Sequence, residues 1–201
     1  MGHTESFLRD ATQAIAQLDQ AAIERMVALF IHTRQQDGRL FILGVGGSAA
    51  NASHAVNDFR KLAGMEAYAP TDNVSELTAR INDEGWDTAF AKWLEGSRLS
   101  ARDLILVLSV GGGNQEKQIS VNLVRALEYA AQVGASICGI VGRDGGYTAQ
   151  VARVCVIVPT ISAHTLTPLA ESFQALVWHL IVSHPDLQVA AAKWESMPTS
   201  S

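Results

Sequence analysis

The chain has 201 residues, of which 48% are hydrophobic and 17% are charged, and its formal net charge at pH 7 is −5. This length suits one α/β domain with a sizeable core, and the apolar content excludes an intrinsically disordered chain. An acidic chain without a long basic run argues against a nucleic-acid partner, and no apolar stretch is long enough to make a membrane span.

Two features of the sequence predict a cytoplasmic location. Cys138 and Cys155 both lie in apolar runs, which is typical of buried free thiols in a reducing compartment. The N-terminus has no apolar signal core, because Glu5, Arg9 and Asp10 interrupt it.

The order of the predicted elements indicates the fold class. Apolar residues at helical spacing predict one long helix or two over residues 5–34, and we assign residues 1–36 to an N-terminal segment that packs between subunits. The first half then predicts a strand Leu40–Leu43, a helix to about Leu62, an extended piece Glu66–Ala69, and helices from Val74 and from Trp86 on either side of the Asn82–Gly85 break. The second half predicts a strand Asp103–Ser109, a helix from the next glycine loop to about Gln132, strands Ala135–Val141 and Val154–Val158, and a helix Thr167–Ser183. Strands that alternate with helices predict a three-layer α/β/α sandwich with a five-stranded parallel sheet. We expect one domain over residues 1–201, with a mobile tail from about Lys193.

Glycine-rich loops follow the predicted strands. The strand Leu40–Leu43 runs into Gly44-Val45-Gly46-Gly47-Ser48 and then into an alanine-rich helical pattern. Glycines allow a tight turn and close approach of a ligand, and the helix start offers unpaired N–H groups and a positive dipole end. Ser109 and Gly111–Gly113 repeat this plan, and Gly142–Gly146 form a third polar turn. Because ligands of parallel sheets bind beyond the carboxyl ends of the strands, we expect the first two loops to share a crevice that cradles a phosphate.

A dinucleotide-binding loop is the alternative interpretation of the first glycine motif. Gly44, Gly46 and Ala49 fit the loose G-x-G-x-x-A pattern, and Glu66 lies about twenty residues further on, where an acid that binds ribose is sought. Three features weigh against nicotinamide or flavin binding. A long helix precedes the strand, a second glycine loop follows a later strand, and the intervening helix carries a His/carboxylate pair that a dinucleotide would not need.

The stretch from Gly44 to His54 reads G-V-G-G-S-A-A-N-A-S-H and resembles the signature of sugar isomerase (SIS) domains, most of all the phosphoheptose isomerase branch. The resemblance continues in order through Thr71-Asp72-Asn73, Leu77-Thr78-Ala79, Asn82-Asp83, the Ser109 loop, Gly142–Gly146 and Thr167–His179. It implies a flavodoxin-like topology and the isomerisation of sedoheptulose 7-phosphate to D-glycero-D-manno-heptose 7-phosphate. It also implies a homotetramer with active sites between subunits, and zinc in several members.

The resemblance further implies a metal site with an acid–base function. His54 and Asp58 are one helical turn apart, and Glu171 and His179 are two turns apart, so each pair shares a helix face. We expect these four residues to bind one zinc or other divalent ion per subunit, with Asp58 and His179 also moving protons.

The register of the last helix decides whether this site exists. Anchoring the resemblance on Thr167-Pro168 places Glu171 and His179 at the ligand positions. A rival anchor on Glu171-Ser172 places Ala170 and Trp178 there, and predicts no metal.

By the same resemblance, nine residues contact the substrate and its phosphate: Gly46, Gly47, Ser48, Asn82, Asp83, Ser109, Gly111, Asn114 and Glu171. Val45 replaces an Asn of the family that meets substrate, and the second loop keeps Ser109 but loses most other hydroxyls. We expect the N–H groups of Gly111–Gly113 to form a nest at a helix start instead, and Lys117, Arg60 or Lys61 to add positive charge.

A second function is compatible with the same resemblance. A non-catalytic SIS protein would bind a sugar phosphate or a protein partner such as a replication initiator, and would need no acid–base set. The presence of all four ligand-type residues favours the isomerase.

Overall fold

The computed structural model describes residues 2–197 and contains a five-stranded parallel sheet with the order β2-β1-β3-β4-β5. The strands are β1 (Leu40–Leu43), β2 (Ala67–Tyr68), β3 (Leu104–Ser109), β4 (Ser136–Val141) and β5 (Val154–Ile157). All neighbouring strands pair in parallel. The predicted parallel sheet with flavodoxin-like order is therefore confirmed.

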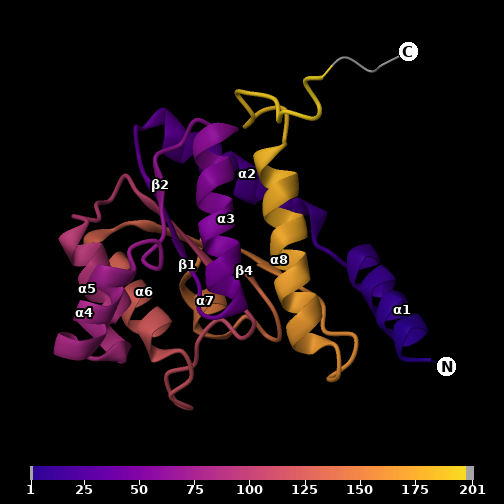
Figure 1. Cartoon of the computed structure of the whole chain (residues 1–201), viewed down its shortest axis with the longest axis horizontal. Coiled ribbons are helices and arrows are strands. Elements are labelled where there is room, and N and C mark those ends of the chain that lie inside the picture. Colours follow the sequence, from indigo (N-terminus) through magenta and orange to yellow (C-terminus); the bar gives the residue numbers. More distant parts are fainter. Residues whose placement is uncertain (1, 198–201) are drawn as a thin grey trace.

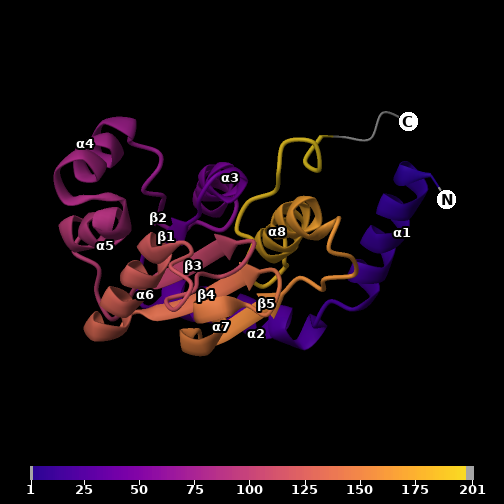
Figure 2. The same ribbon diagram turned by 90° about the horizontal axis from the view of Figure 1, so that it is seen from below.

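Helices cover both faces of the sheet. Within residues 2–197 they are α1 (His3–Ala16), α2 (Gln20–Gln35), α3 (Gly47–Lys61), α4 (Val74–Glu84), α5 (Trp86–Gly96), α6 (Val121–Val133), α7 (Gly146–Val151) and α8 (Leu166–Val182). Helices α2, α3 and α8 share one apolar core with the sheet, whereas α5, α6 and α7 share a second. Figures 1 and 2 show α3 and α8 side by side on one side of the sheet. In the described part of the chain, no helix has the length and apolar character that a bilayer crossing needs.

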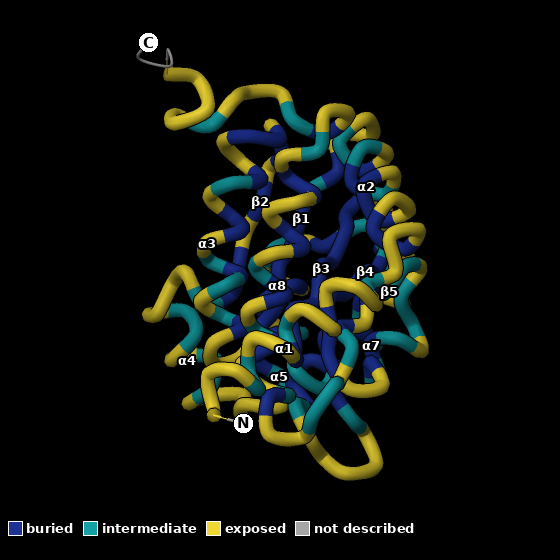
Figure 3. Tube along the Cα trace, turned by 90° about the vertical axis from the view of Figure 1, so that its right-hand side faces the viewer, coloured by how far each residue is buried: buried dark blue, intermediate teal, exposed yellow. Residues whose placement is uncertain are grey.

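Alternating residues of each strand feed the two cores. Leu40 and Ile42 belong to the core under α3 and α8, whereas Phe41 and Leu43 belong to the core under α5 and α6. Successive side chains of a strand point to opposite faces, and both faces of this sheet are covered, so all four residues are buried. The central strands β1, β3 and β4 accordingly form the dark blue centre of the tube in Figure 3.

The two cysteines are free thiols, as predicted. Cys138 and Cys155 lie on the neighbouring strands β4 and β5, but they pack into opposite cores. Burial raises the pKa of the Cys155 thiol to about 11, so this side chain remains protonated and unreactive at neutral pH.

The N-terminal segment is two helices with different surroundings. The Asp19 carboxylate accepts a hydrogen bond from the N–H of Ala22 and caps α2, which separates it from α1. Helix α2 packs into the main core through residues such as Phe30, whose ring stacks on Phe59 of α3 at 4.7 Å between centroids. Helix α1 projects beyond α8 in Figures 1 and 2 and reaches the same core through Ala14, with Phe7 and Ala11 partly buried against it. Of the tail predicted from about Lys193, residues 198–201 lie outside the described part of the chain.

Two stretches differ from the sequence prediction. The helix expected directly after the second glycine loop begins only at Val121, because Asn114 and Ile119 pair across a small turn in which Gln118 and Ser120 adopt positive φ. The prediction that the N–H groups of Gly111–Gly113 form a nest at the start of a helix is therefore wrong. Helix α7 was not predicted, since its six residues are too few to show a periodicity.

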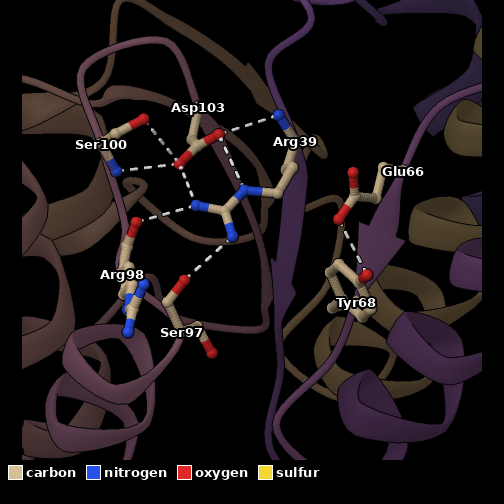
Figure 4. Close-up of polar contacts among 7 residues, drawn as sticks. All are labelled: Arg39, Glu66, Tyr68, Ser97, Arg98, Ser100 and Asp103. Atoms are coloured by element: carbon tan, nitrogen blue, oxygen red, sulfur yellow. Dashed lines mark hydrogen bonds and ion pairs between the residues drawn. The ribbon is translucent and has the colours of Figure 1, made fainter.

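A buried ion pair joins the beginnings of β1 and β3 (Figure 4). Arg39 Nη2 lies 2.8 Å from Asp103 Oδ2, and the side chain of Asp103 is only 2% exposed. The carboxylate also accepts from the backbone N–H of Arg39 and from the N–H and hydroxyl of Ser100. The guanidinium donates further to the carbonyls of Ser97 and Arg98. Burial by itself raises the pKa of Asp103, but these hydrogen bonds outweigh it and hold the pKa below its ordinary value.

We expect Asp103→Asn to lower the free energy of unfolding by about 3–5 kcal/mol, because it leaves the Arg39 charge without its partner. Urea denaturation measures this loss. Asp186→Asn is the matched control: its carboxylate is exposed, and its effect should stay within about 0.5 kcal/mol. Equal effects of the two substitutions would contradict the role of the ion pair.

The same variant should change the response to acid. A carboxylate whose folded pKa is lowered contributes stability above its unfolded pKa of about 3.9, and loses it as pH falls through the folded value. The stability difference between wild type and Asp103→Asn should therefore stay level from pH 7 to about pH 4 and shrink below that. A difference that shrinks already between pH 7 and about pH 5 would assign the effect to another group.

Candidate active site

The two glycine loops meet at one edge of the sheet, beyond the carboxyl ends of the neighbouring strands β1 and β3. They border an open cavity of about 310 Å³. Its lining residues are Val45, Ser48, Ser109, Val110, Gly111, Ile119, Ser120, Arg143, Leu166 and Thr167. The shared crevice expected from the sequence is thus present, and the third loop and the start of α8 complete its wall.

The first loop turns the chain from β1 into α3. Gly46 has φ 63°, a left-handed conformation that favours glycine, and Gly47 is the first residue of α3. Ser48 follows in the first turn, where it is buried and lines the cavity. The unpaired N–H groups and the positive dipole end of α3 therefore lie next to the Ser48 hydroxyl.

The second and third loops are in direct backbone contact. The Ser109 hydroxyl oxygen accepts from the N–H of Gly112 at 3.0 Å, which leaves its O–H free to donate into the cavity. The Thr148 hydroxyl donates to the carbonyl of Gly112 at 2.8 Å. A Cβ on Gly112 would lie 1.9 Å from the carbonyl oxygen of Gly145, so only glycine permits this approach. Asn114 lies outside this cavity, and its side chain caps the N–H of Lys117 instead.

Arg143 is a cavity residue that the sequence analysis missed. A basic residue in a glycine-rich turn after β4, at the same edge of the sheet, was the available signal. The cations proposed in its place lie elsewhere. Arg60 and Lys61 are at the far end of α3, roughly 20 Å along the helix from Gly47, and Lys117 lines a smaller neighbouring cavity.

Three of the four predicted ligand residues come together. Asp58 Oδ2 lies 3.7 Å from the Nε2 atoms of both His54 and His179. Their ligand-type atoms all lie within 4.8 Å of one another, and the exposed fractions of the side chains are 56% for His54, 14% for Asp58 and 49% for His179. Two imidazoles and one carboxylate form a donor set suited to a divalent first-row metal.

Neighbouring residues fix the orientation of this cluster. His179 Nδ1 lies 2.8 Å from the carbonyl oxygen of Ala175 and, as the donor, leaves Nε2 with its lone pair toward Asp58. Asn57 donates to Asp58 Oδ1 at 2.7 Å, so Oδ2 is the oxygen that faces the histidines. The buried ring of Trp178 packs edge-on against His54, with 4.8 Å between centroids.

Glu171 does not join the three ligands in the described structure. Its carboxylate lies over Gly47 instead, where a Cβ would be only 2.5 Å from Oε2. The rival register would put Ala170 at the ligand position of Glu171 and Trp178 at that of His179. Ala170 and Trp178 are both buried. It is His179 that faces Asp58, which agrees with the register anchored on Thr167-Pro168 for this residue.

Asn82 and Asp83 lie away from the cavity. Both are exposed at the end of α4, where Asn82 donates to the Asp83 carboxylate. Neither residue lines the cavity between the glycine loops within residues 2–197. Their predicted contact with substrate therefore stays a prediction.

Comparison with known proteins relates the chain to SIS domains and phosphoheptose isomerases. The sequence profile of the SIS domain matches residues 6–142. The chain is 31% identical over 190 residues to the lincomycin biosynthesis protein LmbN of Streptomyces lincolnensis, covering 89% of this chain and 67% of that protein. It is 32% identical over 164 residues to the phosphoheptose isomerase of Sulfurimonas denitrificans, covering 79% and 78%. The solved structure of phosphoheptose isomerase GmhA from Neisseria gonorrhoeae superimposes with a TM-score of 0.76 at 26% identity, covering 90% of this chain and 93% of that one.

Two glycines of the first loop should differ in their tolerance of alanine. A Cβ on Gly44 would meet the backbone carbonyl of Ser48 at 2.3 Å, and backbone atoms cannot move aside. A Cβ on Gly47 would meet only the end of the flexible Glu171 side chain. We expect Gly44→Ala to cost about 1–3 kcal/mol or more of unfolding free energy, and Gly47→Ala less than about 1 kcal/mol. Urea denaturation of both variants is the check, and equal losses would contradict the described loop.

Proposed function

Because the chain belongs to the SIS domain family, we propose that it is an isomerase of the phosphoheptose type, converting sedoheptulose 7-phosphate to D-glycero-D-manno-heptose 7-phosphate. The observation that carries this proposal is the placement of His54, Asp58 and His179 on the two helices whose other ends border the cavity.

We also propose a cytoplasmic location, supported by the free thiols of the two cysteines.

The cavity between the glycine loops supports binding of the phosphate. The hydroxyls of Ser48 and Ser109 line it, together with Gly111, and the N–H groups of Gly46 and Gly47 begin α3 beside it. Hydroxyl and N–H donors at a helix start bind anions by charge-assisted hydrogen bonds. Ser48 and His54 are six residues apart on α3, roughly 9 Å along its axis, so a phosphate held here leaves the sugar chain to extend toward the cluster.

Asp58 and His179 supply the acid–base chemistry in this proposal. Aldose–ketose interconversion moves a proton between adjacent carbons through an enediolate, and a second proton between the two oxygens. The Asp58 carboxylate takes the proton from the carbon next to the carbonyl and returns it to the neighbouring carbon. When its Nε2 carries no metal, the imidazole of His179 takes the hydroxyl proton there and returns it to the other oxygen, so atoms and charge balance over the cycle.

We propose that His54, Asp58 and His179 hold one zinc or other divalent ion per subunit. The fit rests on their chemistry: two imidazole nitrogens and one carboxylate oxygen converge, and the Nδ1–H of His179 is already directed to a backbone carbonyl. When bound, such an ion would occupy Nε2 of His179 and, in place of that proton carrier, polarise a substrate carbonyl as a Lewis acid. Glu171, predicted as a fourth ligand, lies beside Gly47 of the first glycine loop, and we propose it only as a substrate contact.

We expect His179→Ala to lower kcat by about 10²–10⁴-fold, because it removes a positioned proton carrier. His54→Ala should also lose bound metal. Elemental analysis and an assay of aldose formation from sedoheptulose 7-phosphate measure both effects. His32→Ala, on the exposed side of α2, is the matched control and should change neither quantity. A wild type that carries no metal, cannot be loaded with zinc and keeps full activity after His179→Ala would defeat the proposal.

We propose in addition that the protein assembles as a homotetramer. Helix α1 projects from the sheet and leaves Leu8 60% and Ile15 53% exposed, which is costly for an apolar stripe in water. The imidazoles of His54 and His179, each with about half of its surface in water, also need further cover to exclude solvent from the proposed site.

Light scattering at micromolar concentration should therefore return four chains per particle. Ile15→Glu should reduce the particle mass, because it places a charge in the proposed contact. Val74→Glu, at an exposed position on α4, is the matched control and should leave the mass unchanged. A monomeric wild type would overturn this proposal.

A further inference from the structure

The cavity between the glycine loops contains one charged side chain among its lining residues in the described structure, and that residue is Arg143. We propose that Arg143 binds the substrate phosphate and supplies the positive charge that the hydroxyl-poor second loop lacks. This inference rests on the proposed function for the identity of the ligand, a phosphate ester of a sugar.

A bound phosphate would need a positively charged side chain in this cavity to offset its negative charge. The carboxylate of Glu171 already lies over Gly47 at the start of α3, and a phosphate dianion would add two further negative charges nearby. Ser48 and Ser109 offer hydrogen bonds but no charge. A guanidinium matches a phosphate with two parallel N–H donors, which makes arginine well suited to this task.

The Arg143 side chain is available for this task. Within residues 2–197, no hydrogen bond or ion pair engages its guanidinium, in contrast to Arg39, which is held by Asp103 and two carbonyls. Its nearest acidic neighbour in sequence, Asp144, accepts instead from the N–H of Gly146, although both residues border the smaller adjoining cavity. Arg143 therefore has no competing partner to leave when an anion enters.

The backbone holds Arg143 in an unfavourable conformation. Its φ is 53°, in the left-handed region where a residue with a Cβ is strained. The N–H of Gly142 donates to the carbonyl of Ser109, and the N–H of Tyr147 donates to that of Gly113, so the third loop is clamped onto the second. In this conformation the side chain lies beside the second glycine loop, where its Cδ is 3.6 Å from the position that a Cβ on Gly111 would take.

The test compares three substitutions at this position. Calorimetric titration with inorganic phosphate and with sedoheptulose 7-phosphate, each at low and high ionic strength, measures affinity and its salt dependence. Arg143→Gln should weaken both ligands by about 10- to 100-fold and flatten the salt dependence. Arg143→Lys should recover part of the affinity, since it restores the charge without the planar fork.

Arg143→Gly separates binding from folding. Glycine adopts the left-handed conformation without strain, so this variant should be at least as stable as wild type and yet bind phosphate as poorly as Arg143→Gln. Arg153→Gln is the matched control: it removes an exposed charge just before β5, at the opposite edge of the sheet, and should leave binding unchanged.

The outcomes distinguish this inference from the proposed function. Unchanged affinity and salt dependence in Arg143→Gln would overturn the inference, whether or not the enzyme isomerises its substrate. Phosphate binding that depends on Arg143 without any isomerisation would support the inference and count against the proposed reaction. A loss of stability in Arg143→Gly would show that the side chain acts in folding, and would also overturn it.

Discussion

The ion pair between Arg39 and Asp103 fixes the relative position of the two strands that carry the glycine loops. Each residue immediately precedes its strand, and the register pairs Leu40 with Leu104. A slip by one residue would send every side chain of β1 to the wrong face of the sheet. It would also shift Gly44 relative to Ser109. The cavity beyond the carboxyl ends of the strands therefore depends on a contact at their amino ends.

A second constraint sets the offset between α3 and α8. The side-chain amide of Asn51 donates to the carbonyl of Glu171 and to the side chain of Gln174, across the contact between the two helices. With this offset, Glu171 lies opposite the start of α3, and His179 lies opposite Asp58. The start of α3, where we propose phosphate binding, and the proposed proton-transferring pair Asp58 and His179 are thus held apart along one helix pair.

The sequence was sufficient for the features that depend on local periodicity. Apolar runs that alternate with helical patterns predicted the parallel sheet, and the four-residue spacing of His54 and Asp58 predicted their pairing on one face. Glu171 was misplaced because helical spacing within α8 gives no information on how α8 is offset against α3. The late start of α6 and the position of Arg143 depend on positive φ values and on contacts between loops far apart in sequence, which no periodicity reveals.

The contact between the second and third loops limits which amino-acid substitutions the site can accept during evolution. A Cβ on Gly112 would collide with the carbonyl of Gly145, and one on Gly146 would collide with the carbonyls of Gly111 and Gly113. A larger residue at either position therefore cannot be accommodated by a single compensating substitution, because the obstacle is main chain. Substitutions that alter the lining of the cavity are easier at its non-glycine positions, such as Val110 and Arg143, while the glycines preserve its shape.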